Sequence, residues 1–170
     1  MSATRWLLIA LLFACGLRAF AQSDDDHDPA AILELGGATS WDTPGGTGSY
    51  GPDVAVEVTP IEKWLELEGG FTALFNRHSS EWGVDLLFKK PWTLSKKAEL
   101  MIGVGPEWVH SRENGIGRNA LAGEAVIDFM FWPGGKHRFG WFVEPAYEYT
   151  FGHEHEKSFG ISGGLLIAIR

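Results

Sequence analysis

Acidic side chains recur at even spacings in two neighbouring parts of the chain. Glu124 and Asp128 lie four residues apart, and Glu144 and Glu148 repeat this spacing. Residues an even number apart share one face of an extended strand. Oxygen ligands suit hard cations. The pattern therefore predicts either a cation-binding or cation-conducting interior, or a hydrated polar core that holds shared protons.

Histidines form a second candidate set. His153 and His155 alternate with glutamates in the run "HEHE", and His78 and His110 fall in or near other polar connectors. Imidazole and carboxylate groups together can bind a transition metal. The spacing matches no recognised metal motif, so solvated loop histidines are the alternative.

A hydrolytic site is the third candidate. His78, Ser80 and Glu81 supply a base, a nucleophile and an acid within four residues. Local order alone does not establish the geometry of a triad. The glycines at 45–48 lack the lysine and the helix that a phosphate-binding loop needs. The sequence therefore predicts no enzyme, with a hydrolase as the alternative.

The first 21 residues are organised as a signal peptide. Arg5 supplies a short positive region, residues 6–14 an apolar region, and residues 19–21 (Ala-Phe-Ala) a small-x-small cleavage site. The apolar run is too short to span a bilayer as a helix. The run around Cys15 also resembles a lipobox, so lipoprotein processing is the alternative, and both routes predict export.

Cleavage after Ala21 leaves an acidic chain without cysteine. All 22 Asp and Glu but only 12 of the 14 Lys and Arg follow the cleavage site, which gives a net charge of −10 with neutral histidines. Such a chain is a poor ligand for nucleic acid, and it has no thiol chemistry. The stretch "SDDDHDP" within residues 22–30 predicts a disordered acidic tail.

From Ala31 onward, strand-like runs alternate with turn residues. Eight runs each approach the length with which a tilted strand crosses a bilayer. The predicted strands are 31–41, 50–59, 64–75, 81–90, 98–110, 119–132, 139–151 and 159–169. Connectors after the second, fourth and sixth runs contain proline, whereas the others, including residues 111–118, are mostly richer in glycine and polar groups. This contrast predicts short turns at one end and longer loops at the other.

Apolar and polar residues alternate along these runs. In the fourth run, Val84 and Phe88 share one face, opposite Asp85 and Lys89. The apolar face carries bulky groups and almost no charge, whereas the other mixes carboxylates with small residues that suit a narrow interior. No later stretch resembles a membrane-spanning helix. The pattern predicts an all-β protein, a closed eight-stranded antiparallel up-and-down transmembrane β-barrel over residues 31–170.

The same alternation places many carboxylates inside the barrel. They are Glu34, Asp53, Glu57, Glu66, Glu68, Asp85, Glu99, Glu107, Glu124, Asp128, Glu144 and Glu148. We expect an interior cluster from Glu34, Glu57, Glu66, Glu107, Glu124, Asp128, Glu144 and Glu148. Lys89 is the base that clearly shares this face, and so many carboxylates cannot all ionise without compensation. The possible compensations are protonated carboxyl pairs, bound cations, and the loop arginines Arg77, Arg112, Arg118 and Arg138.

Pro106 and Pro145 lie inside the fifth and seventh runs, next to the inward Glu107 and Glu144. Proline has no N–H to donate, and a closed barrel has no free edge. Each proline is therefore expected to interrupt the hydrogen-bond ladder or to mark a bulge. Such a feature can aim a neighbouring side chain, so the pair points to a special interior site.

Tryptophans fall at or near the ends of the predicted strands. From Trp82 to Trp92 is ten residues, about 33 Å of strand, or about 25 Å when the strand is tilted near 40°. That is the height of an apolar membrane band. Trp64 and Trp132 depart from the outward parity. The pattern predicts two aromatic girdles, made of Trp41, Trp82 and Trp108 toward the longer loops and of Trp64, Trp92, Trp132 and Trp141 toward the short turns.

Residues 31–170 resemble, in architecture, the small eight-stranded outer-membrane barrels of Gram-negative bacteria, typified by the OmpA transmembrane domain and OmpX. In those families the last strand carries a signal for the barrel-assembly machinery, polar-x-Gly-x-x-apolar-x-apolar. Residues 162–169 ("SGGLLIAI") fit this signal, and Arg170 follows where those families usually have an aromatic residue. The resemblance implies an outer-membrane location, assembly by that machinery and contact with outer-membrane lipid.

Three functions are compatible with these features. The first is a non-enzymatic, monomeric barrel without a cofactor, with a role in envelope integrity, surface interaction or limited solute passage. Eight strands leave an interior that side chains fill, which disfavours an open porin-like channel. The second is a cation-binding or cation-conducting barrel that uses Glu124, Asp128, Glu144 and Glu148. The third is a lipid A-type hydrolase that uses His78 and Ser80, because some small outer-membrane barrels modify lipids.

Overall fold

The computed structural model describes residues 29–43, 46, 48–134, 138–151 and 156–169. Across these residues the chain forms strands β1 (Ala31–Thr43), β2 (Ser49–Ile61), β3 (Leu65–Phe75), β4 (Ser79–Ser95), β5 (Ala98–Glu113), β6 (Ile116–Phe131), β7 (Phe139–Phe151) and β8 (Lys157–Ile169). Each predicted strand corresponds to one observed strand. The predicted signal peptide and residues 22–28 of the predicted tail lie outside the described residues.

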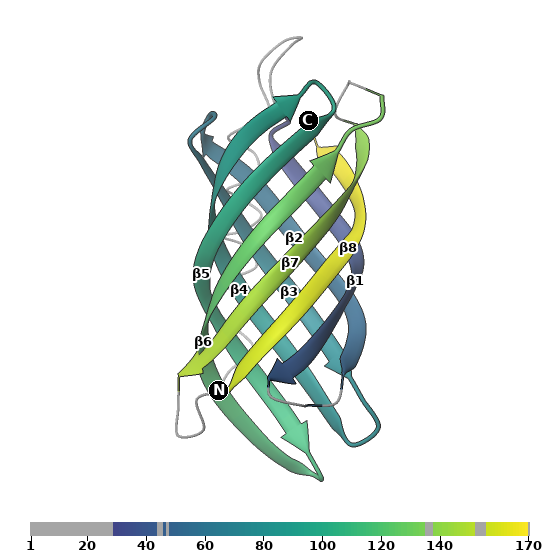
Figure 1. The fold of residues 1–170 in the computed structure, drawn as a ribbon, viewed down its shortest axis with the longest axis vertical. Helices are drawn as coiled ribbons and strands as arrows, with labels where there is room; N and C mark the ends of the chain where they lie inside the picture. Colours follow the sequence, from purple (N-terminus) through teal and green to yellow (C-terminus); the bar gives the residue numbers. More distant parts are fainter. Residues whose placement is uncertain (1–28, 44–45, 47, 135–137, 152–155, 170) are drawn as a thin grey trace, which may run out of the picture.

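The strands close into a barrel in which every strand is antiparallel to its neighbours (Figure 1). Strand order follows sequence order, and β1 pairs with β8 along the whole length of both strands. Figure 1 shows the strands steeply tilted to the long axis of the barrel. This closure leaves no free strand edge in the described barrel, and the prediction of an all-β protein with a closed, eight-stranded, antiparallel up-and-down barrel is confirmed. The described residues include no helix that is both long and apolar enough to cross a membrane.

The barrel has an apolar outer wall and a polar interior. Val84 and Val104 on the outer wall are 46% and 59% exposed, whereas Glu34 and Lys89 in the interior are 1% and 0% exposed. A protein that folds in water shows the opposite distribution, because charged side chains are almost never fully buried there. The prediction that bulky apolar groups face outward and acids face inward is confirmed.

The connector between β5 and β6 is a two-residue turn. Asn114 and Gly115 have positive φ angles of 49° and 85°, as both central residues of a type I′ hairpin turn require. The paired strands therefore extend to Glu113 opposite Ile116. The prediction of a longer loop over residues 111–118 is wrong. The Asn-Gly dipeptide is the sequence signal that could have indicated the turn.

Pro106 and Pro145 each lie beside a gap in the hydrogen-bonded ladder, as predicted. The β4–β5 pairing stops at Asp85 and resumes at Phe88 with unchanged register, and the β6–β7 pairing has a matching gap opposite Pro145. Neither proline therefore introduces a bulge. The missing N–H groups interrupt the ladder locally, and the strands continue in register on both sides.

Glycines allow β1 and β8 to approach closely where the barrel closes. Gly36 lies opposite Gly164. A Cβ atom at Gly164 would overlap the carbonyl oxygen of Leu35, and a Cβ atom at Gly36 would overlap that of Gly163. Since both obstacles are backbone atoms, a side chain at either position would force the two strands apart.

Replacing Gly164 by valine should weaken closure of the barrel. We expect Gly164→Val to lower the free energy of unfolding by about 1–3 kcal/mol or more, the usual range for overpacking. Urea unfolding in detergent micelles measures this change. Gly69→Val is the matched control, because no atom lies within 4 Å of a Cβ atom at Gly69. Equal stability of the two variants would contradict the role of the β1–β8 contact.

Candidate functional site

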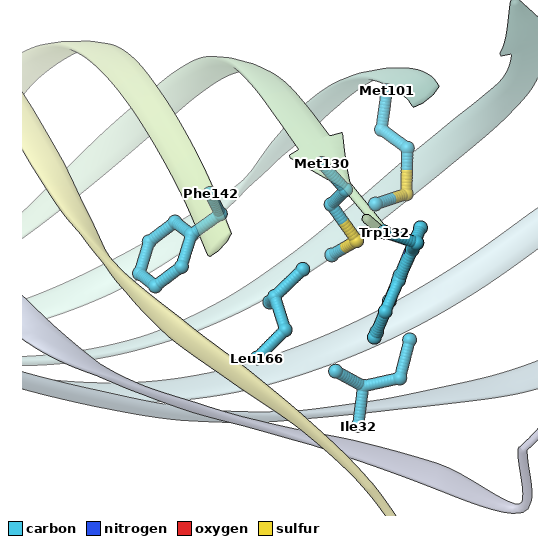
Figure 2. Packing of buried hydrophobic residues seen from close by; sticks show 6 residues of the cluster. All are labelled: Ile32, Met101, Met130, Trp132, Phe142 and Leu166. Carbon is cyan, nitrogen blue, oxygen red and sulfur yellow. The ribbon is translucent and has the colours of Figure 1, made fainter. Parts of the chain in front are cut away.

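An apolar cluster fills the end of the barrel interior nearest the short turns. Its members are Ile32, Met101, Met130, Trp132, Phe142 and Leu166, all at most 8% exposed (Figure 2). They come from β1, β5, β7, β8 and the end of β6, so the cluster extends across the width of the barrel. This packing closes one end of the described interior to water.

Trp132 belongs to this cluster and not to an aromatic girdle. Its exposed fraction is 0%, and its backbone N–H donates to the carbonyl oxygen of Lys97 at 2.8 Å. Even-numbered residues of β6 face the interior, and Trp132 keeps that parity just after the strand ends. The girdle prediction is therefore wrong for Trp132. The remaining predicted girdle residues are all at least 41% exposed: Trp41, Trp64, Trp82, Trp92, Trp108 and Trp141.

Lys89 of β4 is the buried base of the described interior. Its Nζ atom is ion-paired with Glu68 of β3, with Asp128 of β6 at 3.2 Å and with Glu144 of β7 at 2.5 Å. Because the side chain of Lys89 is fully buried, these carboxylates replace the water that would otherwise solvate it. One ammonium group thereby joins four strands through the barrel interior.

Carboxylates outnumber the ammonium group around Lys89. Glu34 of β1 and Glu57 of β2 are each 1% exposed, and one oxygen from each of Glu34, Glu57, Glu68 and Asp128 lies within 4.8 Å of the others. Oε1 of Glu34 and Oδ1 of Asp128 have no hydrogen-bond partner among the described residues. A buried charge is costly without compensation. This group therefore needs protons or a further cation in addition to Lys89.

A cavity lies next to the Lys89 ion pairs, toward the longer connectors. The centres of water molecules can occupy a volume of about 80 Å³ in this cavity. That volume is enough for several waters. The acidic residues that line it are Asp53, Glu68, Glu81, Asp85, Glu107, Glu124, Glu144 and Glu148, and its described lining includes no Lys or Arg. Glu68 and Glu144 also pair with Lys89, so the cavity reaches the ion-pair group.

Glycines make room for two of the cavity carboxylates. A Cβ atom at Gly70 would overlap Oδ1 of Asp85, and a Cβ atom at Gly83 would overlap Oε1 of Glu107. A larger residue at either glycine would push the carboxylate out of its place. Oδ2 of Asp85 is buried and has no hydrogen-bond partner in the described structure.

Hydroxyl groups hold two other cavity carboxylates. Thr72 donates to Asp53 at 2.7 Å, and Thr150 and Ser158 each donate to Glu148 at 3.1 Å. Glu148 of β7 lies directly opposite Glu124 of β6, as the folding of this hairpin about its turn predicts. The cavity wall is therefore a fixed arrangement of oxygen atoms contributed by several strands.

The structure divides the predicted carboxylate cluster into two groups. Glu34, Glu57, Asp128 and Glu144 surround Lys89, and Glu66 lies opposite Lys89 on β3. Glu107, Glu124 and Glu148 line the cavity, which Glu144 also borders. Glu81, which the predicted cluster omits, lines the cavity too. Glu81 lies an even number of residues from Asp85 in the same strand, and this spacing indicates that both side chains face the interior.

The loop arginines, one of the three compensations that the sequence left open, lie outside the buried interior. All four loop arginines are exposed: Arg77, Arg112, Arg118 and Arg138. The positive charge among the buried described residues comes from Lys89 instead. It belongs to a strand and not to a loop, so its place in the interior is set by the β-sheet.

The described histidines do not come together. His110 of β5 lies on the outer wall, with ring centroids 6.2 and 6.0 Å from those of two tryptophans. His78 is exposed in the turn before β4. His153 and His155 lie outside the described residues, so a metal site that includes them stays a prediction.

The residues of the alternative hydrolytic site do not converge. Ser80 and Glu81 are consecutive in β4 and therefore point to opposite faces. Glu81 lines the interior cavity, whereas Ser80 is directed to the outer wall. This geometry gives no support to a His78–Ser80–Glu81 triad.

Comparisons with known proteins identify the fold. No family model matches this chain, and no curated protein matches its sequence. Among solved structures, Neisserial surface protein A (NspA) matches with a TM-score of 0.64 at 9% identity, over 82% of this chain and 96% of that one. The fold is that of the small eight-stranded outer-membrane barrels. The predicted resemblance to this class is confirmed.

Two other outer-membrane-type barrels match at similar levels. Ail, the attachment invasion locus protein of Yersinia pestis, has a TM-score of 0.52 at 13% identity, over 83% of this chain and 100% of that one. The N-terminal β-barrel domain of Pseudomonas aeruginosa OprF has a TM-score of 0.55 at 9% identity, over 83% and 100%. At these identities the likeness extends to the fold alone.

Removing the buried ammonium group should strongly destabilise this barrel. Lys89→Met leaves the surrounding carboxylates without their base, and breaking a buried ion pair typically costs about 3–5 kcal/mol. Urea unfolding in detergent micelles should show a loss of this size. Lys96→Met is the control, because Lys96 is exposed in the β4–β5 turn, and it should cost less than about 0.5 kcal/mol. Equal effects would mean that Lys89 is not the main counter-charge.

Proposed function

We propose that this chain is exported and inserted into an outer membrane as a closed, non-enzymatic barrel that serves envelope integrity or surface interaction. The observation that carries the proposal is the apolar outer wall around enclosed charges. In water, so much exposed apolar surface promotes aggregation, whereas in a bilayer it faces hydrocarbon. The likeness to outer-membrane barrels and the predicted signal peptide support this location.

Outer-membrane lipid is the partner that this wall favours. Trp82 and Trp108 near one end, and Trp92 and Trp141 near the other, are exposed and suit the two membrane–water interfaces. The predicted assembly signal at residues 162–169 lies on β8, the strand that closes the barrel against β1. This position supports assembly by the barrel-assembly machinery. A closed barrel without free edges favours a monomer.

A solute path through the barrel has less support than the other roles. The apolar cluster around Trp132 closes the interior at the short-turn end. Lys89 and its carboxylate partners cross the interior next to it. Side chains therefore obstruct the described barrel at two consecutive levels. This obstruction favours a role in envelope integrity or surface interaction over solute passage.

Cation binding from the long-loop side is a second candidate function, favoured by the acid-lined cavity. Of the residues predicted for such a role, Glu124, Glu144 and Glu148 line the cavity. Asp128 lies deeper, with Lys89. Hard cations prefer oxygen ligands of this kind. The closed short-turn end favours binding over conduction.

Membrane fractionation tests the first function. The expressed protein should sediment with outer membranes and resist extraction by alkaline carbonate, because its apolar wall is stable only against lipid or detergent. Its unheated form should migrate differently from its boiled form in detergent gels. Recovery of the processed chain as a monomer in the water-soluble periplasmic fraction would contradict the proposal.

A further inference from the structure

We propose that the barrel interior binds one divalent, oxygen-preferring cation, for which Ca²⁺ is the reference ion, between Glu34, Glu57, Glu68 and Asp128. This inference rests on the second candidate function, cation binding from the long-loop side, and assigns that function a site. The four residues belong to β1, β2, β3 and β6. The site therefore exists only when the barrel is closed.

The oxygen spacing fits such an ion. One oxygen from each of the four carboxylates lies within 4.8 Å of the other three. Calcium–oxygen bonds of about 2.3–2.6 Å place opposite ligands up to about 4.6–5.2 Å apart. A spacing within this bound is compatible with one ion that contacts all four oxygens, provided that the carboxylate groups adjust by rotation of their side chains.

Unpartnered oxygens provide a second and independent indication of a ligand. Oε1 of Glu34 is buried without a hydrogen-bond partner in the described structure, and Glu34 is 1% exposed. Oδ1 of Asp128 is also unpartnered, while Oδ2 of the same carboxylate pairs with Lys89 at 3.2 Å. Buried polar atoms almost always have a partner. Asp128 thus pairs with Lys89 through one oxygen and keeps a second, unpartnered oxygen that can bind an ion.

The charge balance favours a divalent ion in addition to Lys89. The ammonium group faces Glu34, Glu57, Glu68, Asp128 and Glu144 within one buried group. Lys89 offsets one of these charges, and a divalent ion offsets two more. Shared protons are the competing form of compensation, and the experiment below distinguishes the two.

The acidic cavity supplies a route to the site. Glu68 lines the cavity and is also one of the four ligands, so the proposed ion position adjoins the cavity. On the other side, Glu34 lies opposite Leu166, a member of the apolar cluster. An ion can therefore approach from the long-loop side and is stopped by the apolar cluster.

Calcium titration of the refolded protein tests the site. Protein in detergent micelles is stripped with a chelator, exchanged into buffer and titrated with CaCl₂ by calorimetry, with equilibrium dialysis to count bound ions. We expect about one Ca²⁺ per chain and a raised Tm. Glu34→Gln keeps the shape but removes one charged ligand, and it should weaken binding on the order of 10-fold or more. Glu124→Gln removes a cavity carboxylate outside the four and should weaken binding by less than about 3-fold.

The outcomes separate the site from the function on which it rests. A wild-type barrel that binds neither Ca²⁺ nor, in the same titration with MgCl₂, Mg²⁺ overturns both the site and the second candidate function, and protons then supply the compensation. Binding that survives Glu34→Gln but is lost in Glu124→Gln places the ion in the cavity, which overturns this site and leaves the second candidate function standing. Equal weakening by both variants also overturns it. If Glu34→Gln fails to show folded migration in detergent gels, Glu57→Gln takes its place with the same expectation.

Discussion

A narrow barrel that encloses acidic side chains must supply positive charge from within, because neither its apolar wall nor a surrounding bilayer solvates ions. In this protein Lys89 fills that role, with Glu68, Asp128 and Glu144 paired to one ammonium group. The partners lie on separate strands, so the ion pairs also hold the barrel wall together across its interior. Because carboxylates outnumber this base, a cation bound beside it would offset part of the remaining negative charge.

The interior has three successive levels, and each follows from the residues that face inward there. Apolar side chains around Trp132 close the short-turn end, the Lys89 group occupies the next level, and the acidic cavity lies toward the longer connectors. All three levels are built on the same strands, in which every second side chain faces the interior. The levels differ because the types of inward residue change along the barrel. The arrangement is that of a barrel that holds charges in place and has an acid-lined cavity toward the longer connectors.

Strand positions and side-chain faces could be predicted from the sequence. Alternation of bulky apolar residues with acids placed Glu34, Glu57 and Asp128 inside before any register was known, and the structure agrees. Local patterns do not encode which inward residues meet across the interior, because that depends on the stagger between strands. The meeting of Lys89 with Asp128 and Glu144 is of this kind.

Two errors of the sequence analysis have simple physical causes. Trp132 has the same parity as the inward residues of β6, which predicts a buried side chain. Its position at the strand end instead suggests a girdle residue, and the girdle prediction relied on that position. The polar composition of residues 111–118 predicts a loop. The Asn114-Gly115 turn instead allows both strands to extend beyond it. Strand parity predicts the burial of Trp132 correctly, and the turn chemistry of Asn114-Gly115 predicts the tight turn correctly.

Lipid-phase fluorescence quenching tests the central claim most directly, namely that the apolar wall faces hydrocarbon while the acids are enclosed. An environment-sensitive fluorophore is attached to a single cysteine in place of Val84, Val104 or Leu121 on the outer wall, or of Gly115 in the β5–β6 turn, and the protein is reconstituted in vesicles. Nitroxide groups on the acyl chains should quench the three wall positions strongly and the turn position weakly. Wall positions that aqueous iodide quenches, and that acyl-chain nitroxides do not, would contradict the account.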